Sequence, residues 1–391
     1  MEEQTMTSLT ETALDDEIVA PAVTRAFEAV PDRTAVSSQG QLIWRRFRRH
    51  KLALVGVAVL VALYGSALFC DFVGPYGATD RFARNLAMPP QRPHVFDANG
   101  QFHFPPFVYG VRNQVDLATL ERRYTTDTTQ RYPLQLFAQG GTYRLFGVIP
   151  TDRHLFRVAS PGVWFPFGTD ELGRDIFSRT LQGARISLTI GLVGIALSFL
   201  LGCVLGGISG YYGGRVDMLI QRCIDFLISL PTIPLWMALS AAVPANWSPV
   251  RVYFGITVVL SIVGWTSLAR VVRSKLISLR EEDYIMAARL AGARERTIIT
   301  RHLLPGVASY LIVHLTLAIP GMILGETSLS FLGIGIRPPT VSWGTLLQDA
   351  QNVRSVTLHP WLLIPGAFVI VSVLAFNFVG DGLRDATDPY R

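Results

Sequence analysis

Six long apolar segments constrain the fold of this chain more than any other feature. A helix needs about 20 consecutive apolar residues to cross a bilayer. The segments that approach this length are 52–70, 186–208, 226–243, 252–269, 307–325 and 361–380. One such segment alone is compatible with a buried helix of a soluble protein, but six together predict an all-α polytopic membrane protein with six transmembrane helices. The charged fraction of 16% agrees, because soluble domains carry about 25%.

The distribution of basic residues predicts the orientation of these spans. Arg45, Arg46, Arg48, Arg49 and Lys51 directly precede the first span. Basic residues beside a first span favour a cytoplasmic location for that flank. Six crossings then return the C-terminus to the cytoplasm. A nucleic-acid-binding patch is the alternative for these residues, but their position beside a span argues against it, so we expect no nucleic-acid partner.

The chain divides into five expected regions. Residues 1–41 are acidic and lack apolar periodicity, which predicts a disordered cytoplasmic tail. Residues 42–70 form the basic flank and the first span, and 71–185 form an extracytoplasmic insertion with an interfacial segment. Residues 186–380 contain spans two to six, with a cytoplasmic loop at 272–306, and 381–391 form a cytoplasmic C-terminus.

The insertion between the first two spans is rich in proline and aromatic residues. Residues 142–149 alternate between polar and apolar side chains in part, as strands do. The insertion is therefore expected to be a small folded unit of partly β character, or else an irregular surface loop.

The sequence lacks the motifs that ATP binding, metal binding and catalysis would require. The chain has two lysines, Lys51 and Lys275, and neither follows the Gly-rich loop of a Walker A phosphate site. If ATP drives this protein, another polypeptide must bind ATP and Mg, so no cofactor is expected on this chain. Cys70, Cys203 and Cys223 have no metal-ligand spacing and are expected to act as small hydrophobic residues. No catalytic or metal site is predicted.

The basic loop before the fifth span is predicted to form two short helices. Asp283 suits the N-cap of the first helix, and Gly292 suits its C-terminal turn. A second helix over 295–304 would lead to Pro305 in the first turn of the next span. Such a pair of helices is a compact knob that can fill a groove of a partner. An ordinary amphipathic loop on the membrane surface is the alternative.

This loop resembles a known motif. The spacing of Ala287, Ala288, Gly292, Leu304 and Pro305 is similar to that of the coupling loop in permease subunits of binding-protein-dependent ABC importers. Met286 stands where that family usually has Glu, so this contact would depend on packing. The resemblance continues through the segments 167–179, 183–188, 326–335, 338–344 and 380–389. Together they resemble the C-type permease of oligopeptide, dipeptide and nickel importers over 42–70 and 165–391.

The resemblance implies a type I ABC importer permease fold in a bacterial inner membrane. It also implies a second homologous permease, two ATP-binding subunits, an extracytoplasmic binding protein and surrounding membrane lipid as partners. The implied substrate is a peptide or a similar small solute. The residues implied to couple to the ATPase are Asp283, Tyr284, Met286, Ala287, Ala288, Gly292, Ala293, Leu304 and Pro305.

Two further groups of residues are candidates for structural or transport roles. Gly202, Gly206 and Gly210 recur every fourth residue, which predicts close packing of the second span against another helix. The other group consists of charged residues at an expected external mouth or gate: Asp170, Arg174, Asp175 and Glu326. Solvated ion pairs are the alternative for the first three, and a structural hydrogen bond is the alternative for Glu326.

Two other functions compete with an importer permease. A secondary transporter needs ion-coupling sites in the membrane, and the spans contain few carboxylates. A membrane-anchored protein that acts through the insertion is the other alternative. His94, His103 and His154 lie in that insertion, without a spacing typical of a metal site or a catalytic triad.

Overall fold

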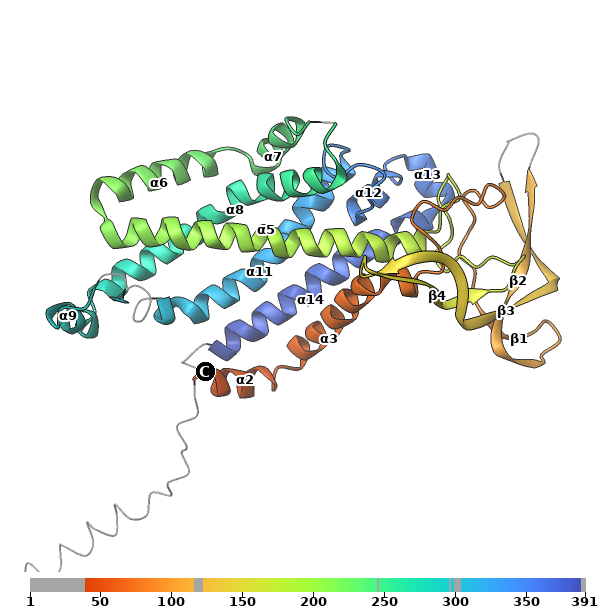
Figure 1. Ribbon diagram of the computed structural model, residues 1–391, viewed down its shortest axis with the longest axis horizontal. Helices are drawn as coiled ribbons and strands as arrows, with labels where there is room; N and C mark the ends of the chain where they lie inside the picture. Colours follow the sequence, from red (N-terminus) through yellow and green to blue (C-terminus); the bar gives the residue numbers. More distant parts are fainter. Residues whose placement is uncertain (1–38, 116–121, 245, 295–296, 299–303, 388–391) are drawn as a thin grey trace, which may run out of the picture.

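The computed structural model describes residues 39–115, 122–244, 246–294, 297–298 and 304–387. Most of the expected N-terminal tail therefore lies outside the described residues, and only 39–41 belong to the first described helix, α2 (Gln39–Phe47). Long helices lie side by side, and a β-sheet stands at one end of them (Figure 1). We call this the sheet end and the opposite one the α9 end, after the short helix α9 (Asp283–Leu290) that protrudes there.

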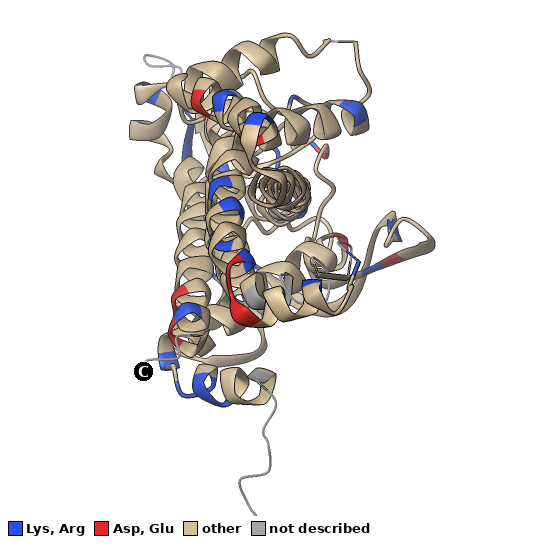
Figure 2. Cartoon of the chain, turned by 90° about the vertical axis from the view of Figure 1, so that its left-hand side faces the viewer, with Lys and Arg blue, Asp and Glu red and all other residues tan. Residues whose placement is uncertain are grey.

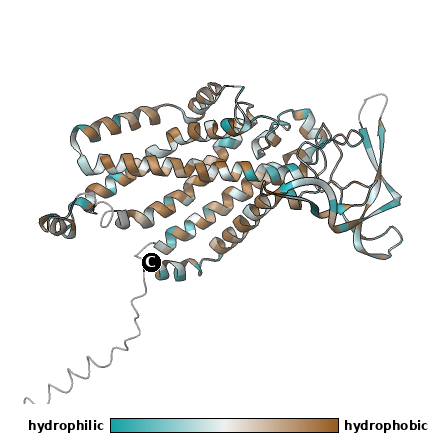
Figure 3. Cartoon of the chain, in the orientation of Figure 1, coloured by the Kyte–Doolittle hydropathy of each residue, from teal (hydrophilic) through white to brown (hydrophobic). Residues whose placement is uncertain are grey.

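Within the described residues, five helices are long and apolar enough to cross a membrane. They are α3 (Lys51–Leu68), α5 (Ile176–Tyr212), α8 (Pro249–Arg280), α11 (Leu304–Phe331) and α14 (Ile364–Thr387). Figure 3 shows these helices as mainly hydrophobic, in contrast to the more hydrophilic sheet. Each of these helices overlaps an apolar segment of the sequence, so the positions of these five spans along the chain were predicted correctly.

The third predicted span is not one straight helix. Residues 226–243 cover the end of α6 (Gly214–Ser229) and the whole of α7 (Thr232–Ala241), and these two helices are bent by 91° at the break between them. The cause is Pro231, because a proline pushes the residue before it out of the helical region. Leu230 accordingly has an extended ψ of 135°. With this pair counted as one span, the structure has up to six crossings.

The second span begins earlier than expected. Asp175 is the N-cap of α5, and its side chain accepts hydrogen bonds from the backbone N–H groups of Phe177 and Ser178. Residues 176–185 therefore belong to this helix and not to the insertion, and α5 is 37 residues long. At the other end of the chain, α14 continues to Thr387, past the expected boundary at 380.

The insertion folds into a four-stranded antiparallel sheet with the order β1-β2-β3-β4. The strands are β1 (His94–Phe96), β2 (Phe102–Val115), β3 (Arg122–Leu145) and β4 (Ile149–Val158). The first half of β3 pairs with β2, and its second half pairs with β4. The prediction of a partly β insertion is confirmed.

Buried contacts hold the sheet against the helices. The buried side chain of His154 on β4 contacts the backbone oxygen of Gly74 at 2.8 Å, just after the short helix α4 (Cys70–Val73). Tyr76, Met88 and Phe165 form an apolar cluster beside it. Desolvation in this cluster raises the pKa of Tyr76 to about 12.

The two described termini meet at the end opposite the sheet. Phe47 of α2 packs with Ala53 and Ala386, and His50 lies 3.8 Å from Asp385. Figure 1 places this junction and α9 on the same side of the bundle. An even number of crossings is consistent with this arrangement.

The main core lies among the helices. Its buried residues come from α3, α5, α8, α11 and α14, and include Leu188, Leu260, Ile323 and Phe376. The short helices α12 (Trp343–Gln348), α13 (Val353–Leu358) and η2 (Pro360–Leu363) close the bundle near the sheet end.

Candidate functional site

The helix α9 is the best candidate for a contact with a partner subunit. It protrudes from the α9 end, at the tip of the long helix α8 (Figure 1). Tyr284, Met286, Ala287 and Leu290 are exposed, and the Leu290 side chain is 90% accessible. An exposed apolar surface of this kind marks a protein interface more often than a solvated loop.

One residue anchors α9 to the bundle. Ile285 is completely buried in an apolar cluster that also contains Leu276 of α8 and Val307 and Leu311 of α11. This cluster connects α9 to residues of two long helices. Ala293 packs at the edge of the same cluster, and Ala288 is half-buried.

The cap of α9 differs from the prediction. Glu282 is the N-cap and Asp283 is the first helical residue, and the N-cap makes no side-chain hydrogen bond. Asp283 still lies in the first turn, where a carboxylate interacts favourably with the helix dipole. Gly292 has a φ of +76°, as expected for a turn after a helix.

The second half of the predicted loop is only partly described. Most of 295–304, where the second helix was predicted, lies outside the described residues. Leu304 and Pro305 begin α11, which places Pro305 in the first turn of that span, as the sequence indicates.

Charged residues join the helices near the α9 end. Arg273 of α8 donates two hydrogen bonds to Asp217 of α6, at 2.5 and 2.6 Å. Ser209 of α5 also donates to Asp217, and Arg280 donates to the backbone oxygen of Tyr211. Figure 2 views this end and shows more Lys and Arg than Asp and Glu on the helices.

Three glycines allow α5 and α8 to approach each other closely. A Cβ atom on Gly202 would lie 2.9 Å from Leu268 Cβ, and one on Gly206 would lie 2.5 Å from the backbone oxygen of Ala269. The corresponding contact of Gly210 is 2.9 Å from the backbone oxygen of Arg273. The structure thus identifies α8 as the helix that the glycine face contacts.

The charged residues at the sheet end form a compact cluster around the buried side chains of Asp170 and Arg179. Asp170 is bound by Arg174 at 2.6 Å and also by Arg179. Asp349, at the end of α12, lies 3.6 Å from Arg174 and 3.8 Å from Arg179. Asp170 and Arg179 are almost fully buried, so these are not the solvated ion pairs that the sequence left as an alternative.

Two carboxyl groups near this cluster are affected by burial. Asp175 is buried at the N-terminus of α5, and desolvation raises its pKa to about 6, although its hydrogen bonds to Ser178 and Phe177 act in the opposite direction. Burial also raises the pKa of Asp349, which the neighbouring Arg179 lowers in part.

Glu326 lies at the centre of a second buried network. Its carboxylate accepts hydrogen bonds from Ser187 of α5 at 2.9 Å and from Ser330 of α11 at 2.7 Å. The same two hydroxyl groups accept hydrogen bonds from the backbone N–H groups of Trp343 and Ile336. Glu326 and these two hydroxyl groups thereby tie α5 and α11 to the loop after α11 and to α12.

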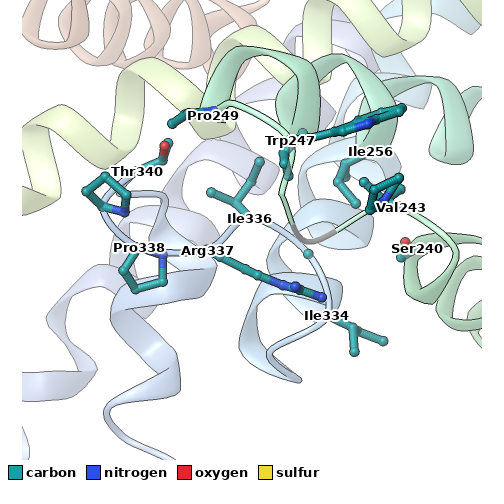
Figure 4. A pocket seen from close by; sticks show the side chains of 14 residues that line it. Ser240, Val243, Trp247, Pro249, Ile256, Ile334, Ile336, Arg337, Pro338 and Thr340 are labelled. Carbon is teal, nitrogen blue, oxygen red and sulfur yellow. The ribbon is translucent and has the colours of Figure 1, made fainter.

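A small pocket opens beside this network. It has a volume of about 170 Å³ and lies between the segment that joins α7 to α8 and the loop after α11 (Figure 4). Its lining is mainly apolar, and Arg337 adds a positive charge. Sites for small molecules usually have about 300–1,000 Å³. This pocket is therefore too small to be the path of a drug-sized solute through the chain.

Sequence reasoning missed several of these residues. Asp217 and Arg273 are 56 positions apart, and Glu326 and Ser187 are 139 apart. Asp349 was not recognised as a member of the charged cluster. Opposite charges on neighbouring spans were the only available signal, and the sequence does not state which spans are neighbours.

Comparisons with known proteins agree with this architecture. Residues 202–390 match the family described as "Binding-protein-dependent transport system inner membrane component". Residues 38–90 match the "N-terminal TM domain of oligopeptide transport permease C". The two matches leave out residues 91–201, which contain all four strands of the sheet and the first part of α5.

Individual relatives are similar over much of the chain. The oligopeptide transport system permease protein OppC of Bacillus subtilis is 39% identical over 57% of this chain and 71% of its own length. The dipeptide transport system permease protein DppC of the same organism is 30% identical over 90% of this chain and 86% of its own length. A solved structure of the MetNI methionine ABC transporter matches 54% of this chain and 96% of its own chain, with 18% identity and a TM-score of 0.44. From the family match and the two relatives, the chain belongs to the family of inner membrane components of binding-protein-dependent transport systems.

Proposed function

We propose that this chain forms one half of the translocation path of an ATP-driven importer for peptides or similar small solutes. A second, homologous permease forms the other half, and an extracytoplasmic binding protein delivers the substrate at the sheet end. Two relatives that are named oligopeptide and dipeptide permeases support the substrate class. The sheet end faces the outside of the cell, and both termini lie in the cytoplasm.

The observation that carries the coupling mechanism is the exposed helix α9 on a buried anchor. Its exposed face includes Tyr284, Met286, Ala287 and Leu290, while Ile285 is fixed between α8 and α11. We place this face in a groove of an ATP-binding subunit. Met286 contributes by packing alone, since it cannot replace the hydrogen bonds of an acidic residue.

Packed long helices could transmit a movement of α9 to the sheet end. The 32-residue helix α8 is about 48 Å long at about 1.5 Å per residue, so it reaches across a bilayer. It packs on α5 along the glycine face, and α11 carries Glu326 near the sheet end. Closure of the ATP-binding subunits would tilt these helices together and open the network of Glu326, which we propose as part of the outer gate with Asp170, Arg174 and Asp175.

Reconstitution tests the dependence on separate ATP-binding subunits. The chain, its partner permease and the ATP-binding subunits are placed in liposomes, and peptide uptake and ATP hydrolysis are measured. We expect uptake only when the ATP-binding subunits and ATP are present. Uptake by the permease chains alone would contradict this function and would favour a secondary transporter.

Substitution of Gly292 tests the coupling contact. Gly292 has a φ of +76°, and a Cβ atom there would meet no other atom within 4 Å. In Gly292→Trp, the bulky side chain is expected to obstruct the partner's groove and abolish peptide-stimulated ATP hydrolysis, while membrane insertion remains. Gly100→Trp is the matched control, because Gly100 has a φ of +79° and equally open surroundings in the β1–β2 turn. Loss of coupling in both variants, or in neither, would contradict the proposed contact.

A further inference from the structure

The turn between β3 and β4 has an unusual composition for a hairpin tip on a water-soluble sheet. Residues 145–150 are Leu, Phe, Gly, Val, Ile and Pro, and none carries a charge or a side-chain hydrogen-bonding group. The side chains of Val148, Ile149 and Phe146 are 77%, 55% and 47% exposed. Exposed loop tips normally carry small or polar residues, and a contiguous apolar tip indicates a surface that is covered by something else.

The backbone of this turn also opposes its sequence. Phe146 and Gly147 have successive φ values of +55° and +76°, and Val148 donates a hydrogen bond to the backbone oxygen of Leu145. This is the pattern of a type I′ turn, in which Asn-Gly is strongly preferred. A bulky residue at positive φ is strained. Phe146 therefore adopts a backbone conformation that its side chain disfavours. Such strain indicates a role for its ring.

Contacts of the hairpin fix the height of the tip relative to the first span. The ring of Phe146 lies 5.5 Å from that of Phe69, at the end of α3. Phe137 on β3 lies 6.1 Å from Phe72 in α4. Leu68 and Phe69 are themselves exposed. The tip and the last turn of the span therefore present one continuous apolar surface at the level where α3 leaves the membrane.

Polar groups border this surface on the side of the sheet. Arg144 and Arg153 flank the tip on the two paired strands and are exposed. Tyr143 donates a hydrogen bond to the backbone oxygen of Arg153 at 2.6 Å. Aromatic and apolar residues below a rim of arginines match the order of acyl chains and phosphate headgroups at a bilayer surface.

We propose that the β3–β4 tip, residues 145–149, inserts into the lipid leaflet next to the end of α3 and anchors the sheet to the membrane. Phe146, Val148 and Ile149 enter the boundary between headgroups and acyl chains, and Arg144 and Arg153 contact lipid phosphates. The anchor holds the sheet in one orientation over the helices. This inference concerns the lipid environment of the sheet, and it holds whatever solute is transported.

A fluorescent probe at the tip tests this proposal directly. Cys203 and Cys223 are replaced by Ala, while Cys70 is retained because its side chain is fully buried and the labelling reagent does not reach it. Val148→Cys is labelled with an environment-sensitive fluorophore in the full chain, which is then assembled with its partner permease and the ATP-binding subunits in nanodiscs of phosphatidylcholine and phosphatidylglycerol. Val115→Cys on β2 is the matched control, since Val115 is also exposed, at 48%.

The quenching pattern separates the possible occupants. We expect nitroxide-labelled lipid to quench the probe at Val148, with a blue-shifted emission and protection from aqueous iodide, and the reverse at Val115. Quenching of Val148 by iodide to the same degree as Val115 would place the tip in water and overturn the proposal. Protection from both quenchers would show that protein covers the tip, such as the second permease, and would also overturn it.

A second variant tests the role of the Phe146 ring. Phe146→Asn installs the Asn-Gly pair that a type I′ turn prefers, so the hairpin is expected to remain folded. Lipid quenching at Val148 is nevertheless expected to fall, because the aromatic anchor is lost. If Phe146→Asn leaves the lipid quenching at Val148 unchanged, the ring has no anchoring role and the proposal fails for this residue.

Discussion

One ion pair at the sheet end and one nearer the α9 end differ in how far their side chains are buried. At the sheet end, the side chains of Arg179 and Asp170 are only 5% and 3% exposed. Nearer the α9 end, the paired side chains of Arg270 and Asp225 are 43% and 52% exposed. Buried polar groups permit one arrangement, because each must keep its partners. Exposed charged side chains can change partners at little cost, which suits a surface that a separate subunit binds and leaves.

The sheet end is therefore held rigidly by buried polar networks, whereas α9 is an exposed helix that a partner can contact. The buried networks of Asp170 and Glu326 join α5, α11 and α12 by many directed bonds. In contrast, α9 is attached mainly by the apolar packing of Ile285. Four predictions test this comparison.

The largest effect is expected from breaking the buried ion pair. Arg179→Met leaves the Asp170 carboxylate with Arg174 as its remaining cationic partner in the cluster. Loss of one member of a buried pair usually costs about 3–5 kcal/mol. We expect the free energy of unfolding, measured by denaturant titration in detergent, to fall by about 3 kcal/mol.

Arg270→Met is the control at the exposed pair. Exposed ion pairs contribute about 0–1 kcal/mol, so little change in the free energy of unfolding is expected. Equal losses in the two variants would show that burial does not distinguish the two regions.

An intermediate effect is expected at the second buried network. Glu326→Gln leaves one acceptor oxygen for the hydroxyl groups of Ser187 and Ser330, so one buried hydroxyl loses its acceptor. The expected cost is about 1–3 kcal/mol in the free energy of unfolding. Glu281→Gln, an exposed position before α9, should change nothing. A neutral Glu326→Gln would mean that the carboxylate is not required as a double acceptor.

A similar effect is expected at the contact between α5 and α8. Gly206→Ala places a Cβ atom 2.5 Å from the backbone oxygen of Ala269, so the helices must separate. Overpacking of this kind costs about 1–3 kcal/mol. Gly321→Ala in α11 meets no atom within 4 Å, and there the better helix propensity should stabilise by about 0.5–1 kcal/mol. Thermal unfolding of the two variants should therefore shift in opposite directions, and a shared direction would contradict the close contact.

The smallest effect is a local dependence on pH in the sheet. Hydrogen bonds from the Gln101 backbone and from His103 hold the pKa of Asp97 down, at about 2, against an ordinary value of 3.8. A carboxylate with a lowered pKa stabilises the fold above its unfolded value, and this stabilisation is lost as the pH falls toward its folded value. Amide exchange at Asn99 and Gln101 should accelerate, relative to the intrinsic rate, as the pH falls from about 4 to about 2. Asp97→Asn should abolish this dependence.

Prediction from the sequence succeeded where a local pattern was sufficient. Length and hydropathy located the apolar segments, and the glycine spacing identified the face of α5 that packs closely. The third span is bent at Pro231, where the sequence marks a break, but neither hydropathy nor the proline gives the angle of 91° between its two helices. The N-cap of α9 was shifted by one residue, since Glu282 and Asp283 are both acidic and local sequence does not distinguish them.

The sequence by itself determined that this chain is a helical membrane protein with a partly β insertion, because bilayer thickness sets the length of a span and side-chain polarity sets its composition. It also indicated the loop that contains α9, through the spacing of small residues around Gly292. Only the tertiary structure decided which distant residues share a site. Asp349 joins Asp170 and Arg179, Ser187 joins Glu326, and Phe146 meets Phe69 through packing between segments far apart in the chain. Such contacts depend on how whole helices and strands pack, and no local pattern of residues specifies that packing.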